Sequence, residues 1–308
     1  VQNASFKVGC ASDSSVQEMA GTIVWMGQTR DGFGRSVFRL NGTSPERISN
    51  DSIEKILNAD SLATVYSWNA NVGSHMLYGL TLVNSGVSLC YDFSTQHWSF
   101  LTYLVSSGVT KTITAITAAG VVTSAAHGYS DGDIVQLLGA GDFDGWQVVS
   151  SVTTNTFTVQ ATGTAFSGIA SCIKYSESWF PILASTRANG VQYMQHYSNG
   201  DLFVMDQTAY RDDVGAIAAR ARTPKFDGGS SKPKSMGEVE LVGDKIDSFA
   251  MIRYTDDDFS SFAGFRPINL SANRSRISRL GQFSRRSFET LHVKNALLRL
   301  EALEIEVV

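Results

Sequence analysis

The chain has 308 residues, of which 43% are hydrophobic and 18% are charged, and its formal net charge is −4. This composition supports a sizeable hydrophobic core and excludes a disordered chain, and the charge argues against a general nucleic-acid binder. No apolar run approaches about 18 residues, the length that a membrane-spanning helix needs. The three cysteines, Cys10, Cys90 and Cys172, are far apart, so they predict no disulfide framework and are expected to be small buried residues.

Strand patterns dominate the first hundred residues. Segments 21–28 and 35–42 are rich in β-branched and aromatic residues and flank Asp31-Gly32, which predicts a hairpin. A short helix is expected over 52–60. Either Asp51 or Ser52 is expected to cap its N-terminus. Further strands are expected over 62–70, 75–83 and 86–93.

The stretch YDFSTQHWSF, residues 91–100, has the pattern of a hairpin that belongs to a propeller blade. Asp92 is expected to brace the turn while Trp98 covers the hairpin from the side. Short strands at regular spacing, separated by Gly and Asn, favour a propeller, a sandwich or a barrel.

From residue 110 to residue 173 the chain becomes rich in Thr, Ala, Gly and Val. Asp131-Gly132 and Asp144-Gly145 mark turns between alternating runs, which predicts a small all-β module. The aromatic segments on its two sides read as halves of one blade. We therefore expect propeller blades over 1–109, an inserted β-domain over 110–173, further blades over 174–250 and a C-terminal blade or closing segment over 251–308.

The second part of the chain again favours strands. A hairpin is expected over 190–206 around Asn199-Gly200, and segment 217–226 alternates like a strand. Cations then gather near the end, with Glu289 as the one acidic residue among them: Arg274, Arg276, Arg279, Arg285, Arg286, Lys294 and Arg299. These arginines are candidates to contact DNA phosphates or the acidic surface of a neighbouring subunit, and we favour the subunit interface.

Chemistry-bearing motifs are few. In residues 254–262, YTDDDFSSF, Thr255 and Asp257 match the Asp-box hairpin of sialidase-like propellers, whereas Phe259 replaces its Gly and Phe262 its Trp. That motif is structural. The five histidines are isolated, and the sequence has no metal-ligand spacing, nucleophile elbow or phosphate-binding loop. We expect no enzyme activity, no catalytic residue, no metal and no cofactor.

The motifs together resemble the packaged-DNA stabilisation proteins of short-tailed bacteriophages, also called tail hub or nozzle proteins. Segment 21–57 matches the family's pattern of Trp-x-Gly, a turn, a strand that ends in Arg-x-Asn-Gly, and Pro-x-Arg-Ile-Ser before a helix. The residues that carry this match are Trp25, Gly27, Arg39, Asn41, Gly42, Pro45, Arg47, Ile48 and Ser49. The blade hairpin adds Tyr91, Asp92, Thr95 and Trp98, and the Asp-box-like turn adds Asp257.

Segments 200–206 and 220–224 also resemble strands of that family, and HGYSDGDIVQLLG, residues 127–139, resembles small β-modules inserted in phage structural proteins. The chain departs from the family in three places: its Asp-box lacks the Gly and Trp, its closing segment has fewer Arg and Trp residues, and the N-terminal portion is expected to be missing here. The fold class expected is thus all-β, with β-propeller-type blades interrupted by a small β-module.

The resemblance implies a structural role in the tail of the virion, after assembly in the host cytoplasm. It implies a ring, six copies in the family, below the portal and its adaptor, which retains packaged DNA and forms the channel for its ejection. The partners implied are the chain itself, portal-adaptor proteins, tail needle or fibre proteins, and double-stranded DNA. Two alternatives stay open: a sialidase-like propeller of a tail appendage and a glycan-binding propeller without activity.

Overall fold

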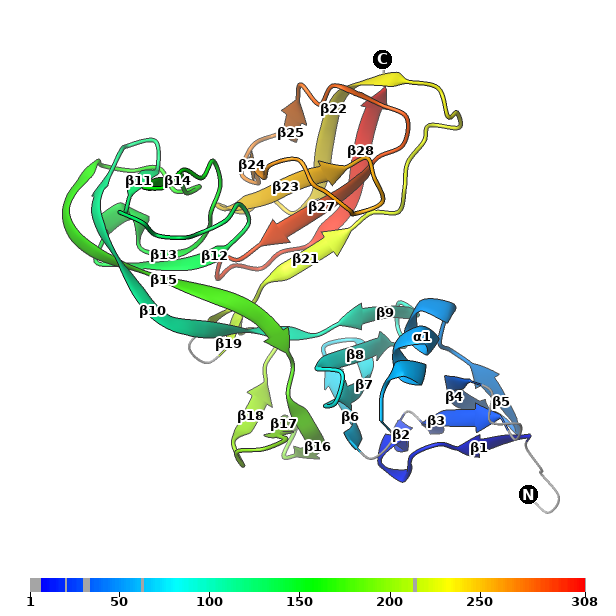
Figure 1. Cartoon of the computed structure of the whole chain (residues 1–308). Coiled ribbons are helices and arrows are strands. Elements are labelled where there is room, and N and C mark those ends of the chain that lie inside the picture. Colours follow the sequence, from blue (N-terminus) through cyan, green and yellow to red (C-terminus); the bar gives the residue numbers. More distant parts are fainter. Residues whose placement is uncertain (1–6, 20, 30–33, 62–63, 213–214, 308) are drawn as a thin grey trace. The chain divides into compact units, whose positions relative to one another are not determined.

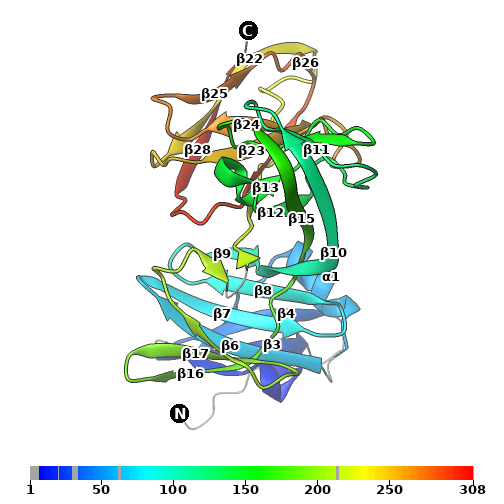
Figure 2. The same cartoon turned by 90° about the vertical axis from the view of Figure 1, so that its left-hand side faces the viewer.

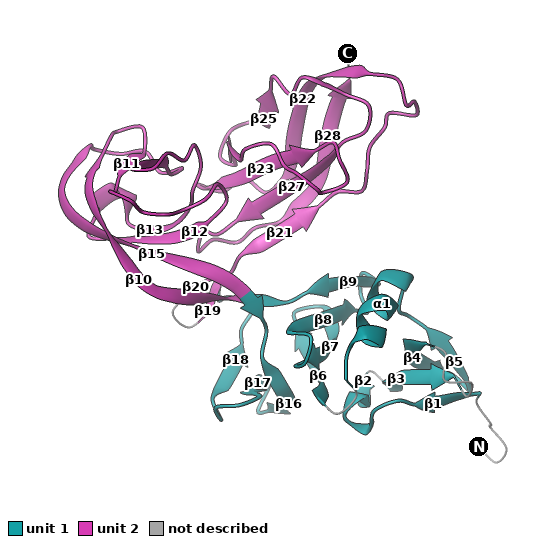
Figure 3. Cartoon of the chain, viewed as in Figure 1, with its two compact units in different colours: residues 1–102, 178–209 teal, residues 103–177, 210–308 magenta. Residues whose placement is uncertain are grey.

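The computed structural model describes residues 7–19, 21–29, 34–61, 64–212 and 215–307 (Figure 1). Antiparallel sheets make up nearly all of its regular structure, so the prediction of an all-β fold is confirmed. Two compact units divide the chain: Val1–Thr102 with Ser178–Ala209, and Tyr103–Glu177 with Tyr210–Val308 (Figure 3). The predicted Asp31-Gly32 turn lies outside the described residues.

The first sheet of unit 1 has the order β1-β3-β4-β5, and β2 also pairs with β3. Its strands are β1 (Val8–Cys10), β2 (Gln17–Met19), β3 (Thr22–Thr29), β4 (Arg35–Asn41) and β5 (Ser44–Arg47). Strands β3 and β4 pair antiparallel, as the hairpin prediction requires. The cysteine prediction holds for Cys90 and Cys172, which are buried, but it is wrong for Cys10, which is exposed on edge strand β1.

Helix α1 (Asp51–Ala59) follows the first sheet. The predicted N-cap is wrong by one residue, because Asn50 has the extended backbone of a cap and its side chain accepts a hydrogen bond from the backbone nitrogen of Ile53 at 3.0 Å. The helix buries Ile53 and Leu57 against the sheets of unit 1.

The second sheet is a four-stranded meander in chain order, the arrangement of a propeller blade. Its strands are β6 (Val65–Val72), β7 (His75–Leu82), β8 (Val87–Asp92) and β9 (His97–Phe100). One core joins it to the first sheet and to α1, with Met26, Val37, Leu57, Leu80 and Leu89 at its centre.

The third sheet repeats the blade pattern with three strands, β16 (Ile182–Ala188), β17 (Val191–His196) and β18 (Leu202–Met205). The hairpin expected around Asn199-Gly200 joins β17 to β18. This sheet packs on the second one through Trp68, Ile182 and Met194. Gly79 makes that packing possible, because a Cβ there would lie 1.9 Å from the Trp68 ring.

The inserted module of unit 2 is one six-stranded sheet with the order β13-β12-β15-β10-β11-β14. Its strands are β10 (Thr102–Ile116), β11 (Val121–Thr123), β12 (Ile134–Leu138), β13 (Gly145–Val148), β14 (Thr156–Thr158) and β15 (Phe166–Trp179). The long strands β10 and β15, by which the chain enters and leaves the module, lie side by side (Figures 1 and 2). The module therefore starts and ends at one place in the fold.

The rest of unit 2 packs two four-stranded sheets on each other, next to the small hairpin of β19 (Arg211–Asp212) and β20 (Gly215–Ala216). The first sheet contains β21 (Ala219–Arg222), β27 (Ser287–His292), β23 (Phe249–Thr255) and β24 (Arg266–Asn269). The second contains β22 (Lys234–Gly243), β25 (Ser275–Ser278), β26 (Gln282–Phe283) and β28 (Leu300–Val307).

This grouping differs from the predicted domain map. The expected boundary at residue 250 falls inside β23, and β22 and β23 share one core through Val239 and Ile252. The compact units change at residues 102/103, 177/178 and 209/210. The predicted segments 1–109, 110–173, 174–250 and 251–308 therefore stay a prediction.

The module packs on the C-terminal sheets of unit 2, and a separate apolar core forms at this contact. Ile134, Val148 and Tyr175 from the module meet Met251 and Leu291 from β23 and β27. At the edge of this core the backbone nitrogen of Phe265 donates a hydrogen bond to the Asp131 carboxylate at 2.9 Å. The predicted turn at Asp131-Gly132 thus also carries a contact between the two parts.

We predict that Leu291→Ala destabilises the protein by about 2–5 kcal/mol, because Leu291 is fully buried where the module meets β27. Ile169→Ala is the matched control: Ile169 is 86% exposed on β15, so its loss should change the free energy of unfolding by less than about 0.5 kcal/mol. Denaturant unfolding followed by circular dichroism compares the two variants. Equal, small effects would show that the module does not pack there.

Candidate functional site

The family-like residues of the first sheet form a polar ladder on β4 and β5. Arg39 lies opposite Glu46 and donates from Nε to its carboxylate at 2.8 Å, and the Asn41 side chain donates to the same oxygen at 3.1 Å. The hydrogen bond from Arg39 lowers the pKa of Glu46 and raises that of Arg39. The ladder is half exposed and fixes the hairpin that turns at Gly42, whose φ is +62°.

Trp25 and Gly27 on β3 have a packing role. Trp25 stacks on Phe38 of β4, with ring centroids 5.9 Å apart. At Gly27 a Cβ would lie within 2.7 Å of both the Phe38 ring and the Val8 side chain. The Trp-x-Gly pattern therefore lets one aromatic ring cover the backbone of the neighbouring strand.

The pattern Pro-x-Arg-Ile-Ser links edge strand β5 to α1. Pro45 sits on the sheet edge, where its missing N–H costs no ladder bond. Arg47 lies 3.4 Å from the carboxylate of Glu54 on α1, and the Ser49 hydroxyl donates to the same carboxylate at 2.8 Å. These contacts orient the helix on the sheet.

The hairpin of β8 and β9 is arranged around Asp92. Its carboxylate accepts hydrogen bonds from the backbone nitrogen of Ser94 at 2.8 Å and the Thr95 hydroxyl at 2.9 Å, and lies 2.7 Å from Nδ1 of His75. Burial raises its pKa, but these contacts outweigh burial, so the pKa of Asp92 lies below its usual value.

Trp98 covers the same hairpin. Its ring packs on Tyr91 with centroids 5.2 Å apart, and its indole nitrogen donates to the carbonyl of Ile48 at 2.8 Å. Trp98 therefore joins the second blade to the turn that leaves the first one.

The turn after β23 has the Asp-box role without the motif's Gly and Trp. Asp257 accepts hydrogen bonds from the backbone nitrogen and hydroxyl of Ser261 and from the Thr255 hydroxyl. These bonds lower the pKa of Asp257 to about 2. Phe259, in place of the motif's Gly, has φ +68°, so the turn keeps the left-handed backbone with a side chain that seldom adopts it.

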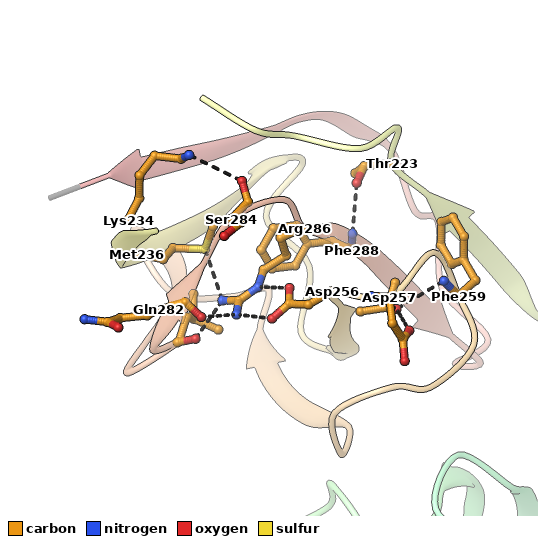
Figure 4. A network of polar contacts seen from close by, with 12 residues as sticks. Thr223, Lys234, Met236, Asp256, Asp257, Phe259, Gln282, Ser284, Arg286 and Phe288 are labelled. Atoms are coloured by element: carbon orange, nitrogen blue, oxygen red, sulfur yellow. Dashed lines mark hydrogen bonds and ion pairs between the residues drawn. The ribbon is translucent and has the colours of Figure 1, made fainter. Parts of the chain in front are cut away.

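Arg286 corrects the prediction that it belongs to an interface or contacts DNA. Only 2% of this residue is exposed, and its guanidinium makes two 2.7 Å hydrogen bonds to Asp256, one to the carbonyl of Leu280 at 2.6 Å and one to that of Gln282 at 3.2 Å (Figure 4). It also stacks on Tyr254, 3.8 Å from the ring centroid. Arg286 is therefore a structural residue, buried within its own chain.

The other predicted contact arginines are exposed, but most pair within the chain. Arg274, just before β25, bonds Glu240 at 2.5 Å, and Arg276 on β25 bonds Glu238 at 2.7 Å; both carboxylates lie on the neighbouring strand β22. Two further pairs are Arg285 with Asp258 and Arg299 with Asp244. Arg279 is exposed and makes no ion pair with any residue that the structure describes.

A cluster that the sequence did not predict lies on the sheet of β21, β27 and β23. Glu289 is fully buried, and its carboxylate binds Arg220 at 2.6 Å, Arg222 at 2.5 Å and Arg253 at 2.7 Å. Glu177, from the module strand β15, binds Arg220 at 2.6 Å. Burial alone would raise the pKa of Glu289, but the Arg222 hydrogen bond and the three charges outweigh it and lower the pKa. We call these five residues the Glu289 cluster.

The register explains the Glu289 cluster. Arg222 and Arg253 lie directly opposite Glu289 on the two strands that flank it, and Arg220 lies two residues from Arg222, on the same face. The alternation in segment 217–226 predicted that Arg220 and Arg222 share a face. It could not identify Glu289, 67 positions from Arg222, as their partner.

Histidines and carboxylates do not gather in the described part of the chain: no group of three or more His, Cys, Asp or Glu there could hold a metal ion. His292 is buried against the Ser248 hydroxyl at 3.0 Å, and burial lowers its pKa to about 4. None of the helices described has the length and apolar character to cross a bilayer.

Residues 1–128 match the model of a family described as Bacteriophage P22 Gp10, beta-propeller. The resemblance to phage DNA-stabilisation proteins is confirmed for this part of the chain. The match supports a structural role in a phage particle and agrees with the blade-like sheets of unit 1.

No curated protein matches the chain. Among solved structures, a phage phi92 endosialidase aligns with 90% of this chain at 13% identity and a TM-score of 0.20. This chain covers 58% of that protein. The TM-score is too low to support an argument about fold or activity.

We predict that Arg286→Ala destabilises the protein by about 2–5 kcal/mol, because it removes a buried side chain that stacks on Tyr254 and takes a hydrogen-bond donor from the carbonyl of Leu280. Arg274→Ala removes an exposed pair and should cost at most about 1 kcal/mol. Denaturant unfolding of both variants distinguishes them, and a loss at Arg286 no larger than at Arg274 would contradict the core role.

The Asp257 carboxyl should titrate near pH 2, and Ser261→Ala should move its pKa upward, because the variant removes one of its hydrogen bonds. The folded-state pKa is lowered from 3.8, so the stabilisation is present above that value and is lost as the pH falls toward 2. Carboxyl NMR titration measures both pKa values. A wild-type pKa near 3.8 would contradict the bonded turn.

Proposed function

We propose that this chain is a structural component of a phage tail, in which copies form a ring around the channel that holds and then releases packaged DNA. The observation that carries the proposal is the family match over residues 1–128. The contacts of its motif residues support it, since Arg39, Asp92 and Trp98 all stiffen blades. Rigid blocks with protected strand edges suit a closed symmetric ring.

The charge distribution is compatible with a conduit. Each phosphate that Lys or Arg neutralises strengthens a salt-dependent grip on DNA, whereas ejection requires the duplex to slide. The exposed Arg274, Arg276 and Arg299 are bonded to carboxylates of their own chain, and the net charge is −4. Neighbouring copies, portal-adaptor proteins and needle or fibre proteins are the partners we propose, and the function requires no enzyme activity.

Among the arginines predicted to contact a partner, Arg279 is the exposed one that pairs with no described residue, so it is our candidate for a contact between copies. Arg279 directly follows edge strand β25, has φ +60° and is exposed. An arginine in this position can bond a carboxylate of a neighbour bidentately.

We predict that the purified chain assembles into a closed ring of about six times its 33.4 kDa mass, and that Arg279→Glu weakens assembly at least tenfold. Arg274→Glu is the control, because Arg274 already has a partner in its own chain. Mass photometry gives the stoichiometry, and negative-stain microscopy shows whether the particle is closed. A monomer or a trimer at micromolar concentration would point to an appendage instead.

In a phage that encodes this chain, its loss should leave filled heads that release their DNA, measured as DNase-sensitive genome in purified particles. Heads that keep their DNA without the chain would contradict a retaining role even if the ring forms.

A further inference from the structure

The Glu289 cluster contains more positive charge than its carboxylates balance. Arg220, Arg222 and Arg253 carry three positive charges, whereas Glu289 and Glu177 carry two negative ones. A buried carboxylate needs compensation, but one well-placed guanidinium and its hydrogen bonds can supply it. A third arginine therefore calls for an explanation beyond the burial of Glu289.

The surplus charge is exposed at Arg222. The Arg222 side chain is 52% exposed, against 26% for Arg220 and 18% for Arg253. Its Nε donates to Glu289 at 2.5 Å, and no described residue accepts a hydrogen bond from its two terminal nitrogens. Arg222 thus presents a guanidinium that is held at one edge and open at the other.

Two aromatic rings lie near this guanidinium. Its central carbon lies 5.6 Å from the Phe259 ring centroid and 6.0 Å from that of Phe262, and Arg253 stacks on Phe262 at 3.8 Å. Phe259 and Phe262 are only partly buried, so each ring keeps apolar surface in solvent. An arginine that is already held by a hydrogen bond loses less conformational freedom when it binds a carboxylate or phosphate through two parallel hydrogen bonds; Arg222 is held in this way by Glu289.

A second positive site adjoins Phe259. Lys225 and Arg285 share a single carboxylate, Asp258, each at 2.7 Å. The neighbouring Asp257 uses its oxygens within the turn, on Ser261 and Thr255.

We propose that Arg222, with Phe259 and Phe262, is a binding site for an oxyanion, a phosphate or a carboxylate, carried on a flat or apolar body. The terminal nitrogens of Arg222 hold two oxygens of the anion, and the phenylalanine rings contact the body that carries it. This site does not depend on ring formation, so it can be tested on the isolated chain.

The test uses phenyl phosphate and benzoate as probes and benzamide as the neutral control of the same shape. Calorimetric titration at low salt should show saturable millimolar binding of at least one anion and none of benzamide. The anion that binds more tightly shows whether the site prefers a phosphate or a carboxylate. The absence of saturable binding of both anions at tens of millimolar would overturn the proposal.

Three variants then test Arg222 itself. Arg222→Gln should weaken binding at least tenfold. Arg222→Lys keeps the positive charge but loses the two parallel donors of the guanidinium, so it should weaken binding severalfold. This variant also tests the site if the Gln variant fails to fold. Arg274→Gln, an exposed arginine on another sheet, should bind like the wild type. Unchanged binding by both Arg222 variants, or equal loss in Arg274→Gln, would show that the anion has no site at Arg222.

Discussion

The C-terminal half of the chain depends on the compensation of two buried charges, Glu289 and Arg286. Each is among the most buried side chains of its sheet, and an unpaired charge there would cost several kcal/mol. Glu289 is matched by arginines on both flanking strands, and Arg286 by Asp256 and two backbone carbonyls. The two residues are three positions apart on and beside β27, so one strand must be placed correctly for both to be satisfied.

The pairing of these two buried charges contributes more to fixing the register of β27 than to the stability of the fold. A shift of β27 by one residue would turn Glu289 into the core that Phe288 occupies and leave the arginines without a partner. Glu177 extends the same network to module strand β15. The module is thereby held on the C-terminal sheets by an ion pair as well as by the apolar core around Leu291.

Local patterns in the sequence predicted the parts of the fold that local chemistry decides. Hairpins at Gly-containing turns, the short helix and the Asp92 and Asp257 turns follow from alternation and turn residues. The N-cap was missed because Asn50, Asp51 and Ser52 are consecutive and all able to cap, and backbone geometry alone selects Asn50. The Trp and Gly of the first sheet were identified by resemblance, and only the structure shows that Gly27 makes room for Phe38.

The environments of the arginines and the packing of the module could not be predicted from the sequence, because they depend on residues that are far apart in the chain. Seven cations near one end of a chain suggest a surface, yet their environments range from the buried Arg286 to the exposed Arg279, which forms an ion pair with no described residue. The difference is set by partners 30 or more positions away, Asp256 for Arg286 and Glu240 for Arg274. The same holds for the module, whose composition revealed an insertion but not the surface on which it packs. These distant pairs matter for the proposed mechanical role, because they determine which charged side chains remain available to bind a partner.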